Sequence, residues 1–314
     1  MTSMPTTETT PTPVPAGPTS GPPAARFDVA ALQTALQQIV QGIRDERTHA
    51  EMLFKQSEAL TSLLGWLRPD APFPATRGWA ASPDFLQLEV EAIREVARRD
   101  GLEGLHVVEA SSGVSTLTAA YTLKRLGADP STCGVTSYEH DATYARQTRE
   151  MIEDHDLADF ASVVHAPLVA QEIEGMPFQW YDSTTIEQLA PISILVVDGP
   201  PGRLGPIARF PALPRFAARL RPGAIVLADD AARPGEIEMV RRWAAAHPNA
   251  TVESIATEKG AARLRFSRIS VMSRVPASFR GTTGPARPRR SIPAPPAPAG
   301  AAVVGSPRAC GVRR

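Results

Sequence analysis

The stretch Leu-His-Val-Val-Glu-Ala-Ser-Ser-Gly-Val-Ser, residues 105–115, decides the fold of this chain. It is an apolar run that ends in an acid, followed by three small residues and then by apolar residues at helical spacing through Leu126. This order predicts a buried parallel strand that turns tightly into a helix. Small residues let the backbone approach a ligand closely, and the first helical turn offers free N–H groups. We therefore expect a binding site at this turn.

The turn carries a single glycine, Gly113. A dinucleotide fingerprint needs three glycines, in the pattern G-x-G-x-x-G, to seat a pyrophosphate against the helix. A nicotinamide or flavin dinucleotide is therefore disfavoured, and a ligand without phosphates fits the turn better.

The segment Glu109-Ala-Ser-Ser-Gly-Val-Ser-Thr resembles the E/D-x-G-x-G-x-S loop of class I methyltransferases that use S-adenosylmethionine (SAM), particularly the bacterial methyltransferase-24 type. The first glycine of the family is Ser111 in this chain. The resemblance covers roughly residues 75–270. It implies SAM as cofactor and a SAM site made of Glu109, Ser111, Ser112, Gly113, Ser115, Glu139, His140, Ala166 and Pro167.

Length and composition predict one core domain of about 200 residues between two ends of low complexity. We expect a disordered Thr/Pro-rich tail over residues 1–25, a helical region over 26–100, a SAM-binding domain over 101–275 and a disordered basic Pro/Ala-rich tail over 276–314. The expected fold is α/β, a Rossmann-like, seven-stranded, doubly wound sheet whose last strand is antiparallel, with an N-terminal helical extension.

Charge and cysteine content narrow the partners and the compartment. Residues 259–314 hold twelve basic residues and no acidic one, but few aromatics interleave them, so a solvated tail is expected rather than a nucleic-acid partner. Cys133 and Cys310 lie too far apart in sequence to suggest a disulfide framework. No apolar segment has the length of a signal or a membrane span, so we expect a cytoplasmic protein without a membrane partner.

A long amphipathic helix is predicted from the N-cap Asp28 onward. Its apolar residues recur at alternating spacings of three and four, at Val29, Leu32, Leu36, Ile39 and Ile43, and again from Ala50 to Leu67. Glu46 and Ser57 fall on the same seam. Two roles stay open, packing on the core or homo-oligomerisation through this helix.

The segment Arg-Gly-Trp-Ala-Ala-Ser-Pro-Asp, residues 77–84, resembles the entry of methyltransferase-24 type proteins before their first strand. Ser82 and Pro83 are typical of a helix start. The resemblance implies that Trp79 or Ser82 lies near the cofactor. The alternative is that Trp79 is a core plug and Ser82 merely a cap.

Glu139 ends a predicted strand over Gly134–Glu139 that follows the opening strand and helix. An acid at the tip of the neighbouring strand is where Rossmann-like sites bind two ribose hydroxyls with one carboxylate. We therefore assign Glu139 to the ribose, the alternative being an ordinary acid that flanks a helix.

After a helix over 142–155 and a strand over 161–165, the turn at His165 lies where the family contacts adenine. His165 is one candidate base, although a lone histidine at a strand end is more often structural. Residues 170–190 interrupt the alternation of strand and helix. Their aromatics Phe178, Trp180 and Tyr181 predict either a substrate wall or a cluster that seals a loop.

Three acids end two later strands, Asp198 after the run 192–197 and Asp229 with Asp230 after 223–228. They should converge at the carboxyl edge of the sheet, where such a cluster shares a proton or binds a hard cation. The pattern resembles the magnesium site of catechol-type and macrolide-type O-methyltransferases, although Pro201 stands where catechol-type enzymes carry a lysine. The alternative is that the acids cap a turn and a helix.

These patterns together predict SAM-dependent methyl transfer, to an oxygen of a small molecule or glycan. In one version Mg²⁺ at Asp198, Asp229 and Asp230 holds the acceptor hydroxyl. In a second version no metal takes part and Asp198 or His165 is the base. A third option is a nucleoside-binding or interaction protein that keeps the fold and lacks the chemistry.

Overall fold

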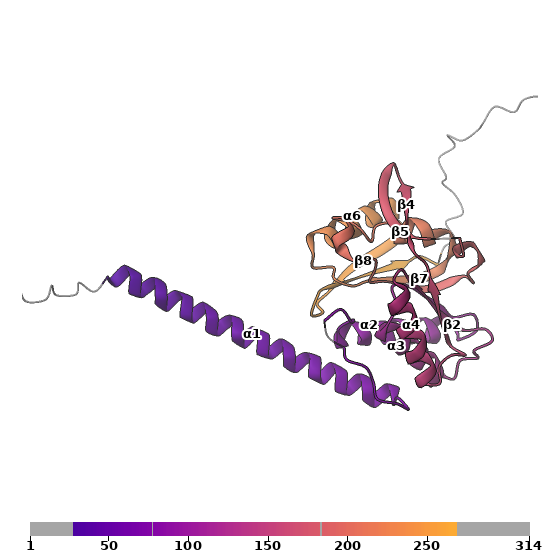
Figure 1. The fold of residues 1–314 in the computed structure, drawn as a ribbon, viewed down its shortest axis with the longest axis horizontal. Coiled ribbons are helices and arrows are strands. Elements are labelled where there is room, and N and C mark those ends of the chain that lie inside the picture. The colour runs from indigo at the N-terminus through magenta and orange to yellow at the C-terminus, as the bar shows by residue number, and fades with distance from the viewer. Residues whose placement is uncertain (1–27, 77, 183, 269–314) are drawn as a thin grey trace, which may run out of the picture. The chain divides into compact units, whose positions relative to one another are not determined.

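The computed structural model describes residues 28–76, 78–182 and 184–268 and is built around a seven-stranded sheet (Figure 1). The strand order is β3-β2-β1-β6-β7-β9-β8, and β9 runs antiparallel to the other six strands. This is the Rossmann-like, doubly wound sheet with an antiparallel strand near one edge that the sequence predicts. The strands are β1 His106–Ala110, β2 Gly134–Glu139, β3 Ala161–His165, β6 Ile192–Val197, β7 Leu220–Ala228, β8 Ala250–Ile255 and β9 Ala261–Phe266.

Helices cover both faces of the sheet. In the view of Figure 1, α2, α3 and α4 lie together in the lower part of the domain and α6 lies in the upper part. These helices are α2 Pro83–Asp100, α3 Val114–Leu126, α4 Ala142–Asp154 and α6 Pro234–Ala246, and a short α5 spans Ala212–Phe216. The predicted end of α3 and the predicted bounds of α4 are confirmed to within one residue.

Two separate cores follow from the alternation of side chains along the strands. Val107 packs with α2 and α3 in one core, whereas its neighbour Val108 packs with α5, α6 and Trp243 in the other. The same division separates Val196 from Val197 on β6. Because both faces of the central strands are buried, these strands read as unbroken apolar runs in the sequence.

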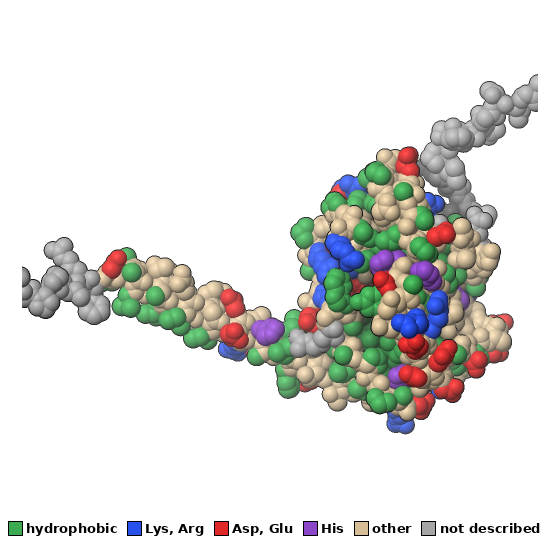
Figure 2. Space-filling model, viewed as in Figure 1, with side chains coloured by type: hydrophobic (Ala, Val, Ile, Leu, Met, Phe, Trp, Pro, Cys, Tyr) green, Lys and Arg blue, Asp and Glu red, His purple; other side chains and the backbone are tan. Residues whose placement is uncertain are grey.

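The long helix α1 spans Val29–Leu67, as predicted, and the Asp28 side chain caps its first turn by accepting from the N–H groups of residues 30 and 31. Its C-terminal part packs on the core through Leu63 and Leu67 and through a 2.7 Å hydrogen bond from Gln56 to Asp84. Residues 28–51 are exposed, and hydrophobic side chains lie along one edge of them (Figure 2). Core packing therefore accounts for only the second half of the helix.

Residues 168–181 form a separate pair of strands. The sequence predicts that residues 170–190 interrupt the alternation of strand and helix, and two antiparallel strands form there, β4 Leu168–Ile173 and β5 Met176–Tyr181. Glu174 and Gly175 connect them with positive φ angles of 50° and 76°. Such angles are those of a tight hairpin turn, and the alternation along residues 168–173 is too weak to reveal a strand pair from the sequence.

The two predicted tails lie outside the described residues, as does Cys310. Cys133 is a buried free thiol. Among the helices within residues 28–268, none combines the length and apolar character that crossing a membrane requires.

A pair of buried carboxyl groups joins α2 to the central strand. Glu89 and Glu109 are both fully buried, and they are close enough for the charge of Glu109 to act on Glu89. Burial, first of all, and then the charge of Glu109 raise the pKa of Glu89 well above its ordinary value. A proton held by Glu89 therefore avoids a second buried charge beside Glu109.

Glu89→Gln tests this bound proton. Above the ordinary carboxyl pKa of about 4.3, Glu89 ionises in the unfolded chain but stays protonated in the folded one, so the wild type loses stability as the pH rises towards the raised pKa. The neutral variant lacks this loss. Its stability relative to wild type should increase with pH, by up to about 1.4 kcal/mol per pH unit in that window, in denaturant melts.

Glu91→Gln is the matched control, because Glu91 is exposed on the same helix and should show no such trend. An equal difference between Glu89→Gln and wild type at acid and alkaline pH would mean that Glu89 is ionised in the folded protein.

Candidate functional site

The candidate site lies at the carboxyl edge of the parallel strands, where β1 pairs with β2 on one side and with β6 on the other. The chain leaves β1 towards β2 and β3, then returns to continue with β6 and β7. A crevice opens at such a reversal of strand order, and ligands of open α/β sheets bind there. The strand tips deliver Glu139, Asp198 and Asp229 to this crevice.

The turn after β1 is built from strained backbone. Ser111 has a φ of 147° and Gly113 a φ of 141°, values that favour glycine. The Ser111 hydroxyl is buried, with no hydrogen-bond partner among the described residues. A non-glycine residue held in such a conformation is a candidate for a functional role, because strain persists only where the surroundings enforce it.

Glu109 supports the turn from beneath rather than lining the cavity. It is fully buried, and its Oε2 accepts 2.5 Å hydrogen bonds from the hydroxyls of Thr116 and Ser137. Ser115 is also buried beneath the turn. The two residues therefore hold the turn in place, and neither is among the residues that line the cavity described below.

Glu139 faces the cavity from the end of β2. Its Oε1 accepts a 2.9 Å bond from the N–H of Asp141, and its Oε2 accepts a 3.2 Å bond from the hydroxyl of Ser112. His140 Nδ1 lies 2.8 Å from Oε1. These contacts fix the carboxylate at the strand tip, with further acceptor capacity for a ligand, as a ribose-binding acid requires.

A cavity of about 310 Å³ joins these groups to the acids of β6 and β7. Trp79 forms part of its wall with 81% of its surface exposed, so the prediction that it is a core plug is wrong. Lys259 Nζ donates a 2.9 Å bond to the carbonyl of Ala80 and thereby fastens the Trp79 loop. The lining residues are Gly78, Trp79, Ser111, Ser112, Glu139, His140, Asp141, Tyr144, Tyr181, Asp198, Gly199, Pro201, Gly202, Arg203, Arg209, Asp230, Arg233 and Lys259.

An arginine that the sequence analysis did not single out lies among the three aspartates. Arg209 is only 4% exposed, and its Nη2 lies 3.2 Å from Asp198 Oδ1 and 2.8 Å from Asp230 Oδ2. Arg233 approaches Asp230 Oδ2 at 2.8 Å from the other side. The predicted convergence of Asp198, Asp229 and Asp230 is present, since a ligand atom from each lies within 4.8 Å of the others.

Burial shapes the protonation of the cluster. Burial, first of all, raises the pKa of Asp198 to about 6, against the opposing effect of Arg209. Burial and the charges of Asp198 and Asp230 raise the pKa of Asp229 to about 8, and neither oxygen of Asp229 has a partner among the described residues. At neutral pH Asp229 therefore holds a proton, while the guanidinium of Arg209 pairs with Asp198 and with Asp230, and Arg233 pairs with Asp230 as well.

This arrangement does not fit a divalent cation as it stands. Three convergent carboxyls are a suitable donor set for Mg²⁺, and the free oxygens of Asp229 face no competitor. However, the guanidinium of Arg209 already takes an oxygen of Asp198 and one of Asp230. A metal bound to both would lie beside a buried positive charge, so Arg209 would have to move away first.

Tyr181 is another cavity-lining residue whose side chain could take part in chemistry. It ends β5, is 2% exposed and lies in the cavity wall, whereas its neighbour Trp180 is fully buried. Burial, followed by the charge of Glu139, raises the pKa of Tyr181 well above its ordinary value, so the phenol stays protonated. Of the aromatics predicted either to form a substrate wall or to seal a loop, Tyr181 therefore lines the cavity, whereas Trp180 is a core residue.

Three predicted residues lie apart from the cavity. His165 is exposed at the end of β3, Ala166 is buried behind it and Pro167 is exposed. None of the three is among the cavity-lining residues, so the structure does not bring His165 to the acids as a base. Gly113 likewise contributes the shape of the turn rather than a wall.

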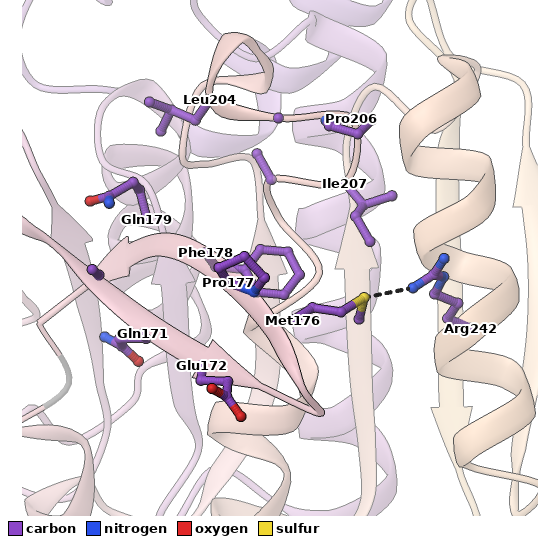
Figure 3. A pocket seen from close by; sticks show the side chains of 13 residues that line it. Gln171, Glu172, Met176, Pro177, Phe178, Gln179, Leu204, Pro206, Ile207 and Arg242 are labelled. Atoms are coloured by element: carbon purple, nitrogen blue, oxygen red, sulfur yellow. Dashed lines mark hydrogen bonds between the residues drawn. The ribbon is translucent and has the colours of Figure 1, made fainter.

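A second cavity, of about 730 Å³, lies between the β4–β5 hairpin and residues 204–208 (Figure 3). Phe178 stacks on Phe210 with ring centroids 5.8 Å apart. Figure 3 shows Met176 pointing to Arg242, with 3.1 Å between Sδ and Nη1. Phe178 thus lines this second hollow and not the cavity with Glu139 and Asp198.

Comparisons with known proteins bear on the fold. No family model and no curated protein matches the sequence. Similar solved structures include a methyltransferase of Podospora anserina with S-adenosylhomocysteine (SAH) bound, at 13% identity, 71% coverage of this chain, 96% of that chain and a TM-score of 0.46. An O-methyltransferase of Bacillus cereus with SAH matches at 17% identity, 67% and 91% coverage and a TM-score of 0.43. A methyltransferase of Geobacter sulfurreducens matches at 15% identity, with 57% of this chain and 88% of that chain covered and a TM-score of 0.39.

Because these identities and TM-scores are low, the function of this chain has to be inferred from its own site. The site brings together seven of the residues predicted for the cofactor, the base and the metal, as cavity walls or as part of the acid cluster. They are Ser111, Ser112, Glu139, His140, Asp198, Asp229 and Asp230, and Trp79 and Tyr181 also line the cavity.

Ser111→Gly tests the strain in the turn. Glycine adopts the observed φ without cost and removes a buried hydroxyl that lacks a partner, while it adds conformational entropy to the unfolded chain. The net effect should be a stabilisation of about 1 kcal/mol in urea denaturation. Ser111→Ala is the control, because alanine keeps the strained Cβ. If the alanine variant were at least as stable as the glycine variant, the turn would not be strained.

Proposed function

We propose that this protein is a SAM-dependent methyltransferase that acts on an oxygen of a small molecule or glycan. The observation that carries the proposal is the single cavity in which Glu139 and the strained turn at Ser111 face Asp198. A nucleoside-binding acid and a candidate base thus share one space at the switch point of the sheet. The wall is formed by loops, which carry no general code for the acceptor.

The half of the cavity around Glu139 fits a nucleoside. The Glu139 carboxylate is suited to two ribose hydroxyls, and Ser111 and Ser112 present the backbone of the turn. When bound, SAM supplies an electrophilic methyl group on a sulfonium. What remains for the protein is to align an acceptor oxygen with that group and to take up its proton.

Asp198 is our candidate for the base. Its pKa of about 6 leaves it mostly ionised at neutral pH yet basic enough to accept a proton from a hydroxyl during transfer. Bound SAM would supply the methyl group, and Asp198 would accept the proton that the acceptor hydroxyl gives up during the transfer. Arg209 holds the Asp198 carboxylate in position through the 3.2 Å contact.

A metal-assisted version of the reaction is the second candidate. In its favour stand the convergence of the three aspartates and the free oxygens of Asp229. Against it stands Arg209, which neutralises the cluster from within. We favour transfer without a metal, because the charge that Mg²⁺ would supply is already present in the side chains.

Calorimetry with SAH tests the cofactor assignment. Glu139→Gln should weaken binding at least tenfold, since hydrogen bonds to a charged group contribute about 1.5 to 3 kcal/mol. Glu153→Gln is the matched control, because Glu153 is exposed on α4 and lies outside the cavity. Wild type that binds neither SAM nor SAH would remove the proposal. Binding without turnover over a panel of hydroxylated acceptors would favour a non-catalytic nucleoside-binding protein.

The pH profile of methyl transfer tests the role of Asp198. The rate should rise as the pH increases through about 6, because only ionised Asp198 accepts a proton, and then reach a plateau. Asp198→Asn should lower the plateau by at least about a hundredfold. The same rates are expected in a chelator and in excess Mg²⁺. A rate that depends on Mg²⁺ and is lost in Asp229→Asn would establish the metal-assisted version instead.

A further inference from the structure

The exposed half of α1 has no place in the proposed reaction. Residues 29–43 are exposed, although five large apolar side chains recur there at spacings of three and four. The exposed fractions are Val29 63%, Leu32 58%, Leu36 56%, Ile39 61% and Ile43 64%. We call these five residues the seam, which follows one edge of the helix (Figure 2). Apolar side chains this regular on an exposed helix indicate a missing partner.

The core of the protein does not supply that partner. The residues of α1 that are buried in the chain itself are Gln56, Ala59, Leu63 and Leu67. They begin thirteen residues after Ile43, and the intervening stretch carries the acid Glu46 on the line of the seam. Among the residues that the structure describes, the seam therefore has no partner, and a regular row of exposed apolar side chains indicates a binding surface.

Charge decides which kind of molecule fits. Residues 29–43 include no charged side chain on any face. An amphipathic helix that binds a membrane surface normally carries Lys and Arg on its polar face, and nucleic acid requires a basic one. A neutral helix, by contrast, can approach its own copy without repulsion, and a spacing of three and four is the pattern of helices that pack on each other.

We propose that the seam binds the same seam of a second copy of this chain. An antiparallel arrangement fits the charges at its ends. When Leu36 lies opposite Ile39 of the second copy, Asp28 lies opposite Arg47 of that copy, and the two Glu46 side chains are far apart. A parallel pair would instead bring the two Glu46 side chains together on the seam. The seam is only two heptads long, so an affinity in the micromolar range is expected.

Analytical ultracentrifugation of the full chain tests the proposal. From low to high micromolar concentrations the mass should rise from 33.6 kDa towards twice that value. The double variant Leu36→Gln with Ile39→Gln should weaken dimerisation by at least about a hundredfold, since each copy then loses two large apolar contacts. Its fold should be unchanged, because both side chains are exposed in the single chain.

The matched control is Ala31→Gln with Thr34→Gln, which places the same amides on the face away from the seam and should dimerise like wild type. Wild type that stays monomeric at all concentrations would overturn the proposal, as would equal dimerisation of the two double variants. So would binding of monomeric wild type to neutral or anionic phospholipid vesicles that the seam variant abolishes. The affinity for SAH should be the same in all forms, so failure here leaves the proposed function standing.

Discussion

The contact of Arg209 with Asp198 and Asp230 is the interaction on which the candidate site depends. Parallel strands deliver their last residues to one edge, and in this chain that edge receives three aspartates within a few ångströms. Like charges so close together, and so well buried, destabilise the folded state unless a cation or a proton compensates them. Here both occur, because Arg209 lies between two of the acids and the raised pKa of Asp229 keeps a proton on the third.

Two further acids near the turn after β1, Glu109 and Glu139, are also held by neighbouring groups. Glu109 lies buried under the turn, where its Oε2 accepts from two hydroxyls and where the raised pKa of Glu89 avoids a second buried charge beside it. Glu139, at the next strand tip, is instead held by the N–H of Asp141 and faces the cavity. Two acids that each come at the end of an apolar strand in the sequence thus have different roles. One is a structural support and the other a candidate ligand-binding group, and burial separates them.

Much of this arrangement could be predicted from the sequence because it depends on local periodicity. The central strands read as apolar runs that end in acids, and the ends of α3 and β2 follow from Gly127 and Glu139. The β4–β5 hairpin could not be predicted, since its residues show little alternation. Nor could Arg209, because it follows no strand tip, and only the tertiary fold brings it to Asp198. Ser111 was recognised as a departure from glycine, but its positive φ becomes evident only in three dimensions.

A crystal structure with SAH and Mn²⁺ would test the central claim most directly, namely that this edge of the sheet is a nucleoside site whose acids are neutralised by the protein itself. The account predicts the nucleoside in the cavity with its ribose hydroxyls on Glu139, Arg209 still bonded to Asp198 and Asp230, and no anomalous peak for manganese among the aspartates. A manganese peak there, with Arg209 turned away, would contradict the claim, and so would a nucleoside bound elsewhere.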